Sequence, residues 1–262
     1  MISLFDFRPI QKIFQQAVAD ESLKYRSVKS HQQHTIESLP AALKNYLMHC
    51  GYTVDNRSSY CHIKWNYAHL KMAPGKKWSV LKCHQVNFLP DPARIVLFET
   101  KLFGIIPFGA IDSYQAGKGN MLIKLLSYFT VANSRGRKMD IAELVTILAE
   151  AILVPAYFLQ PYIQWEEINP YTLRGTINYH GLKASGIFYF NSNFVIEKFE
   201  TTDRCYTDKK GKFHPVRWTA ECSGYTRHGE ISFPTTFKST WNFQTGDFTY
   251  FQGQINTIII NP

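Results

Sequence analysis

The segment from residue 139 to 159 is apolar on almost every side, yet it carries a stripe of acidic residues. Asp140, Glu143 and Glu150 recur at helical spacing on one face, and aliphatic residues cover the others. A carboxylate at the centre of a bilayer costs roughly 2.5–3.5 kcal/mol, and Pro155 interrupts the run. The pattern therefore predicts a helix buried in a protein core rather than a membrane span.

Most of the remaining chain has the strand period of two. Alternating runs between residues 60 and 127 predict five antiparallel strands in a meander, and further runs separated by Gly, Asn and Asp turn signals follow Pro161. Roughly eleven or twelve strands are too many for a small sandwich. The sequence therefore predicts a mainly β (α+β) fold, in which a large curved antiparallel sheet or half-barrel wraps around the apolar helix at 139–154.

The beginning of the chain is helical in pattern. Pro9 and Pro40 each open a run of apolar residues with helical spacing, and Gly51 is a stop signal after the second run. We expect residues 1–52 to form helices that pack on a single half-barrel domain at 53–262.

Composition limits the partners of this chain. The net charge of +9 favours weak attraction to phosphate-rich surfaces, but the Lys and Arg residues form no block of five or more. No nucleic-acid fold signature accompanies them, so we expect no specific nucleic-acid partner and only peripheral membrane contact. Five cysteines at irregular spacing include no CxxC pair. We therefore expect reduced thiols, no metal site and no other cofactor.

The sequence shows neither a secretory signal nor a transmembrane helix. This predicts a cytoplasmic protein as written, and a periplasmic or membrane-associated one if the sequence is truncated. The oligomeric state stays open.

An ordered series of motifs between Leu39 and Ile260 resembles a bacterial domain family whose catalogue name records only unknown function. The motifs are LPAALKNY at 39–46, GKKW at 75–78, DSYQAGKG at 112–119, DIAEL at 140–144, LAEA at 148–151 with Pro155, and GDFTY at 246–250. The family is similar in outline to the lipoprotein-carrier fold of LolA and its relatives. That resemblance implies a half-barrel of antiparallel strands with helices in its mouth.

Three polar residues are candidates for contact with a ligand. Asp112 and Tyr114 lie two apart on a predicted strand and face the same side, so they either bind a ligand's polar end or hydrogen-bond the adjacent turn. Glu150 is either solvated or buried with Arg, Lys, Tyr or Trp partners.

Asp140 followed by Glu143 has capping-box spacing, which predicts the start of the central helix.

Aromatic residues of the predicted strands are candidates for the wall of an apolar cavity, and each is equally compatible with an ordinary core. They are Trp65, Trp78, Phe108, Tyr114, Trp165, Phe188 and Trp241.

Motifs of common nucleophiles are missing: the sequence contains no GxSxG elbow, HExxH helix or phosphate loop. We expect a non-enzymatic protein that binds a hydrophobic or amphipathic, lipid-like molecule in the half-barrel. Two alternatives stay open. One is an enzyme that uses Glu150 or Asp112 as an acid or base on a small molecule, and the other is an interaction module that uses an edge strand or the N-terminal helices.

Overall fold

The computed structural model describes residues 7–25, 34–52, 59–208 and 210–260. Helix α1 (Ile10–Tyr25), the 3-10 turn η1 (Ile36–Ser38) and helix α2 (Ala41–His49) come first. Six strands follow: β1 (Tyr60–Leu70), β2 (Ser79–Phe88), β3 (Ala93–Leu102), β4 (Ile106–Gln115), β5 (Lys118–Leu125) and β6 (Phe129–Ser134). The helices begin after Pro9 and Pro40, and Gly51 has the positive φ of 75° that ends the second helix, as the sequence predicts.

The central helical segment comprises α3 (Arg137–Ala149) and the 3-10 turns η2 (Glu150–Ile152) and η3 (Pro155–Leu159). The other strands are β7 (Ile163–Asn169), β8 (Thr172–Tyr179), β9 (Leu182–Phe190), β10 (Ile196–Thr201), β11 (Cys205–Thr207), β12 (Phe213–Pro215), β13 (Arg217–His228), β14 (Ile231–Phe243) and β15 (Gly246–Ile260).

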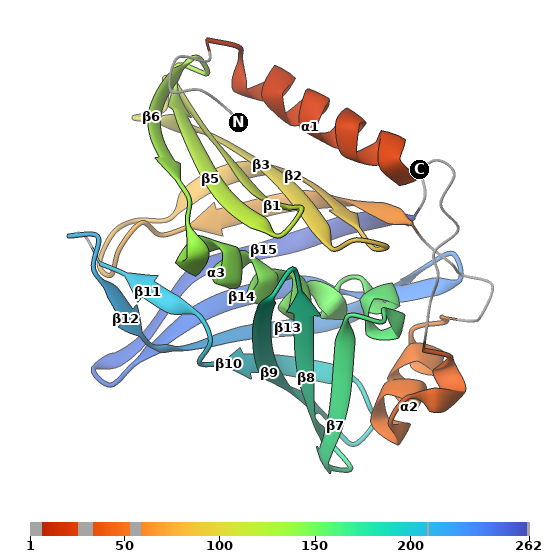
Figure 1. Cartoon of the computed structure of the whole chain (residues 1–262). Coiled ribbons are helices and arrows are strands. Elements are labelled where there is room, and N and C mark those ends of the chain that lie inside the picture. The colour runs from red at the N-terminus through yellow and green to blue at the C-terminus, as the bar shows by residue number, and fades with distance from the viewer. Residues whose placement is uncertain (1–6, 26–33, 53–58, 209, 261–262) are drawn as a thin grey trace.

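Thirteen strands form one antiparallel sheet that curves around α3 without closing (Figure 1). The spatial order is β6-β5-β4-β3-β2-β1-β15-β14-β13-β10-β9-β8-β7, and β11 and β12 pair separately. The chain therefore runs outward from the middle of the sheet to the edge strand β6, crosses as α3, and returns from the other edge strand β7. This confirms the predicted fold class. The first meander has six strands instead of five, because the short segment 129–134 also pairs as β6.

Helix α3 differs from the predicted 139–154 at both ends. It begins at Arg137 after Gly136, which has a φ of 113°, and no side chain caps it. The capping-box prediction is therefore wrong, and Asp140 instead accepts the backbone N–H of Gly119 at 2.8 Å. The α-helix ends at Ala149 and continues as the 3-10 turn η2, and Val154 before Pro155 leaves helical geometry with a φ of −127° and a ψ of 75°.

The apolar faces of α3 pack inside the concavity against β4, β5, β8 and β9. None of the helices that the structure describes is long and apolar enough to cross a membrane. The acidic stripe instead faces other parts of the protein, because Asp140, Glu143 and Glu150 are all buried.

The two N-terminal helices cover different parts of the sheet. Helix α1 lies on the outer face, where Ile10 and Ile13 pack on alternate residues of β3 such as Ile95. Helix α2 closes one end of the concavity, and the Tyr46 hydroxyl donates to the Ile152 carbonyl at 3.0 Å. Because β3 is covered on both sides, its first five residues are buried without alternation.

Gly119 allows β5 to approach the start of α3. A Cβ atom at this position would lie 2.5 Å from the carbonyl oxygen of Met139. We expect Gly119→Ala to lower the free energy of unfolding by about 1–3 kcal/mol, because backbone on both sides must move. Urea unfolding checks this, with Lys118→Ala as the control. The account of this contact is wrong if the two variants are equally stable.

Candidate functional site

A cavity of about 330 Å³ lies between the concave face of the sheet and the C-terminal part of α3. Its wall is mainly apolar, because alternate residues of each strand point into the concavity. The larger side chains of this wall are Trp65, Leu70, Leu81, Phe98, Phe108, Trp218, Phe237, Tyr250 and Phe251. The volume is at the lower end of the roughly 300–1,000 Å³ that is typical of small-molecule sites.

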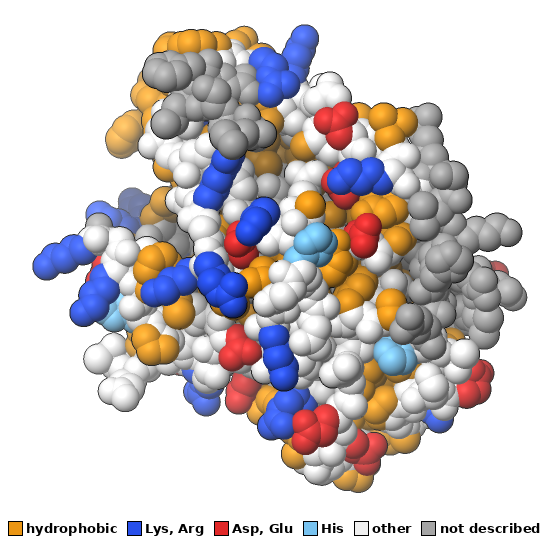
Figure 2. All heavy atoms as spheres, in the orientation of Figure 1, with side chains coloured by type: hydrophobic (Ala, Val, Ile, Leu, Met, Phe, Trp, Pro, Cys, Tyr) orange, Lys and Arg blue, Asp and Glu red, His pale blue; other side chains and the backbone are white. Residues whose placement is uncertain are grey.

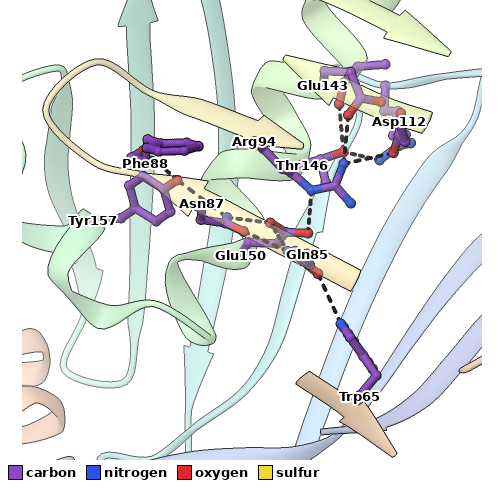
Figure 3. A network of polar contacts seen from close by, with 12 residues as sticks. Trp65, Gln85, Asn87, Phe88, Arg94, Asp112, Glu143, Thr146, Glu150 and Tyr157 are labelled. Atoms are coloured by element: carbon purple, nitrogen blue, oxygen red, sulfur yellow. Dashed lines mark hydrogen bonds and ion pairs between the residues drawn. The ribbon is translucent and has the colours of Figure 1, made fainter. Parts of the chain in front are cut away.

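Arg94 is the centre of a buried polar network at the inner end of this cavity (Figure 3). Its Nε donates to Glu150 Oε1 at 2.8 Å, and its Nη1 donates to Asp112 Oδ2 at 2.8 Å and Glu143 Oε2 at 3.2 Å. One cation of β3 thus binds carboxylates from β4, α3 and η2. Burial alone would lower the pKa of Arg94, but the three carboxylates outweigh it and raise that pKa, so the guanidinium stays charged.

Glu150 receives two further hydrogen bonds on its other oxygen. Gln85 Nε2 and Asn87 Nδ2 each donate to Glu150 Oε2 at 2.9 Å, and Gln85 Oε1 accepts the indole N–H of Trp65 at 3.2 Å (Figure 3). Asn87 Nδ2 also donates to the Tyr157 hydroxyl at 3.4 Å, and this hydroxyl donates to the Phe88 carbonyl at 3.0 Å. The buried, paired alternative for Glu150 therefore holds, and the solvated alternative is wrong.

Glu143 and Glu150 differ in their hydrogen-bond donors. Glu143 Oε2 accepts from Arg94 Nη1, and the same nitrogen also donates to Asp112 Oδ2. Burial and the nearby Asp112 carboxylate raise the pKa of Glu143 to about 8, although Arg94 and Arg204 act in the opposite direction. This carboxyl therefore keeps its proton to a higher pH than an exposed glutamate does.

Two polar groups of the cavity keep unused hydrogen-bonding capacity. Asp112 Oδ1 is buried and has no hydrogen-bond partner in the described part of the chain. Arg204 donates to Thr146 Oγ1 at 2.6 Å, and its guanidinium lies 4.9 Å from the Trp218 ring centre. Arg204 forms no ion pair with any residue that the structure describes. Both residues line the cavity.

The structure brings Trp65, Phe108, Asp112 and Glu150 to the cavity, from elements far apart in sequence. The turn-bonding alternative for Asp112 is wrong, because its partner is Arg94.

The other candidates lie elsewhere. Tyr114 is buried in the main core, and its hydroxyl has no hydrogen-bond partner among the described residues. Trp165 and Phe188 pack 5.4 Å apart in the same core. Trp78 stands outside the cavity under the Lys71 ammonium, and Trp241 stacks on Tyr250 behind the cavity wall.

Sequence reasoning missed the residues that organise the site. Arg94 is a charged residue within an apolar strand, and Gln85 and Asn87 lie two apart on another buried strand. These interruptions of apolar strands were the available signal, because a buried polar side chain requires a partner. Arg204 lies in an irregular segment between β10 and β11 and gave no such signal.

No group of three His, Cys, Asp or Glu side chains among the described residues is arranged to hold a metal ion.

Glu150→Gln removes one charge from the buried network and brings an amide toward the amides of Gln85 and Asn87. We expect a loss of about 3–5 kcal/mol in the free energy of unfolding, as for other broken buried pairs. Glu166→Gln is the matched control, because Glu166 pairs with Arg174 at an exposed position and its loss costs about 1 kcal/mol or less. A loss for Glu150→Gln no larger than the control's would contradict the pairing.

Glu143→Gln should have the opposite effect. The folded-state pKa of about 8 lies above the usual 4.5, so the folded chain keeps a proton that the unfolded chain releases. This proton stabilises the fold fully below the unfolded-state pKa of 4.5, and the stabilisation is lost as the pH rises through about 8.

The amide keeps a neutral side chain at every pH. Between about pH 5 and about pH 9, the variant should therefore gain about 4 kcal/mol in the free energy of unfolding relative to the native chain. Denaturant titrations along this pH range measure the difference, and a constant or falling difference would show that Glu143 is ionised throughout.

Comparisons with known proteins place this chain in a family. A family model described as a family of unknown function (DUF6920) matches residues 37–259. A comparison with curated proteins gave no match.

Several solved structures are similar. A LolA superfamily protein from Nitrosomonas europaea is 10% identical, with 85% of this chain and 93% of that chain covered and a TM-score of 0.45. A putative outer membrane lipoprotein-sorting protein domain from Vibrio parahaemolyticus is 14% identical, with 77% and 85% covered and a TM-score of 0.42. A DUF1329 family protein from Desulfovibrio piger is 11% identical, with 84% and 92% covered and a TM-score of 0.44. These TM-scores indicate a loose likeness, and nothing about a ligand follows from them. The family match spans nearly the whole chain and confirms the family expected from the motifs: the protein belongs to the DUF6920 family of unknown function.

Proposed function

We propose that the protein binds a hydrophobic or amphipathic small molecule in the cavity beside α3. The observation that carries this proposal is an apolar wall that also contains two polar groups: Asp112 Oδ1, which has no hydrogen-bond partner among the described residues, and the Arg204 guanidinium, which forms no ion pair among them. A purely structural cavity gains nothing from a buried acceptor without a donor, which costs about 1–3 kcal/mol. A ligand supplies the missing partner.

The arrangement also defines the chemistry of the ligand. Its apolar part contacts rings such as Trp65, Phe98 and Phe251, whose burial favours binding through the hydrophobic effect. Its polar end donates a hydrogen bond to Asp112 and accepts one from Arg204. A hydroxyl group on an acyl or alkyl chain has both properties.

The enzyme alternative has less support. Glu150, one of the two carboxylates considered as an acid or base, accepts hydrogen bonds from Arg94, Gln85 and Asn87 on both oxygens. Both oxygens of this carboxylate are therefore occupied by donors of the protein, whereas an acid or base must contact the substrate proton that it transfers. The apolar wall of the cavity also favours binding of an intact molecule.

Ala110 offers a direct test because it lines the cavity on β4, two residues from Asp112. The phenyl ring of Ala110→Phe occupies space that the ligand needs. Isothermal titration calorimetry with decanol and decanoic acid should show one-to-one binding of at least one probe, with a negative heat-capacity change from apolar burial. We expect Ala110→Phe to weaken that binding about tenfold or more, which is the cost of losing the contacts of one or two buried methylenes.

Ala19→Phe is the matched control, because Ala19 is exposed on α1 at the outer face of the sheet. Thermal unfolding of both variants establishes that each is folded. The proposal fails if native protein with the mass of the bare chain binds neither probe, or if both variants bind equally well.

A further inference from the structure

We propose that one edge of the sheet docks on the surface of an anionic lipid bilayer. This hairpin edge consists of the turns β1–β2 (71–78), β3–β4 (103–105) and β5–β6 (126–128). The inference goes beyond ligand binding. Its evidence comes from these turns and not from the polar residues of the cavity.

The strand register brings the three turns to the same edge. Leu70 pairs with Ser79, Leu102 pairs with Ile106, and Leu125 pairs with Phe129, so each hairpin reverses at the same level of the sheet. Adjacent strands are about 4.8 Å apart, which places neighbouring turns about 10 Å from one another. Figure 1 shows the turn between β5 and β6 at the upper left of the molecule.

The turns expose large apolar side chains. Phe103 is 92% exposed, Ile105 76% and Met72 68%, and Leu126 and Tyr128 are each almost half exposed. In Figure 2, hydrophobic side chains gather at the upper left, where these hairpins end. Contiguous apolar surface of this kind marks an interaction site.

The backbone at two tips is strained in order to present these residues. Phe103 and Leu126 both have a φ of 52°, and Ser127 has a φ of 66°. Left-handed positions of hairpin turns favour Gly, Asn or Asp, and a bulky apolar residue there is an outlier. At the β5–β6 turn the backbone is held by hydrogen bonds, because Ser127 accepts the N–H of Ile10 and Leu126 donates to the Pro107 carbonyl. The exposed side chains of Phe103 and Leu126 have no such role, and strain combined with exposure indicates a function.

The charge of the hairpin edge identifies the partner. Lys71, Lys76, Lys77 and Lys101 lie in or beside these turns, and segments 71–78, 101–107 and 126–131 contain no Asp or Glu. Basic residues around protruding apolar and aromatic side chains fit the interface of an anionic bilayer, where the rings enter the headgroup region. A flat, deformable surface also contacts three separate tips without the shape complementarity that a protein partner needs.

The hairpin edge is continuous with the cavity. Met72 of this edge lines the cavity wall, as do Leu70 and Leu102, which end the strands that lead into its first two turns. A docked protein would therefore turn the open end of the cavity toward the lipid, so an amphipathic molecule passes between bilayer and cavity without crossing much water.

Vesicle flotation of the full chain tests the inference. Vesicles of phosphatidylcholine with phosphatidylglycerol should carry the protein, and vesicles of phosphatidylcholine alone should carry much less. We expect the double variant Phe103→Ser with Ile105→Ser to bind anionic vesicles about a hundredfold more weakly, since each removed side chain contributes about a tenfold change. The double variant Ile168→Ser with Tyr171→Ser is the matched control, because it removes two exposed apolar residues from the β7–β8 turn.

A second measurement tests whether the side chain at position 103 inserts into the bilayer. Phe103→Trp should show an emission blue shift with anionic vesicles and quenching by brominated lipids, which reports insertion of this side chain. The inference is overturned if native protein does not float with anionic vesicles, or if both double variants lose binding equally. It is also overturned if sedimentation equilibrium shows that the tip variant abolishes self-association instead, which would make the hairpin edge an interface between two copies. Calorimetry with decanol tests the cavity separately, so failure of docking leaves ligand binding standing.

Discussion

A single buried cation, Arg94, determines where the central helix lies. Its guanidinium binds Asp112 on β4, Glu143 on α3 and Glu150 on η2, and all four side chains are almost fully buried. Buried charges of this kind are costly unless they are paired and hydrogen-bonded. Any shift of α3 along the sheet would leave a carboxylate without its donor, so the network selects one position of the helix.

This position divides the concavity into a filled part and an open part. Toward η3 and α2, rings such as Phe158, Phe188 and Tyr46 pack edge to face and leave a solid core. Toward the hairpin edge the cavity extends from the Arg94 network to Leu102. The polar network and the apolar cavity are therefore consequences of the same placement of α3. Ligand binding and membrane docking both use the part of the sheet that this placement leaves uncovered.

Local signals in the sequence predict most of the secondary structure. Pro9, Pro40 and Gly51 mark helix ends through their own backbone preferences, and alternation marks the strands. The same local reasoning failed at Asp140, where a tertiary hydrogen bond to Gly119 replaced the cap that the spacing suggested. Trp165 and Phe188 lie in the packed core, which the sequence left open for each aromatic candidate, because periodicity does not distinguish a cavity wall from a packed core.

The site itself depends on contacts between distant segments. Arg94 and Glu150 are 56 positions apart, and β1 pairs with β15 near the opposite end of the chain. Such contacts depend on the order of the strands in the sheet. A single sequence determines that order only through all of its strands together. A buried Arg within β3 indicates that an acidic partner exists but does not identify it.

The central claim is that the open part of the concavity holds a ligand. Native mass spectrometry of the full chain, purified without detergent and followed by organic extraction, tests it most directly. The account predicts an added mass at one-to-one stoichiometry and release of a molecule with an apolar chain and a hydrogen-bonding end. A bare chain that stays bare after incubation with mixed lipids and alkyl alcohols would contradict it.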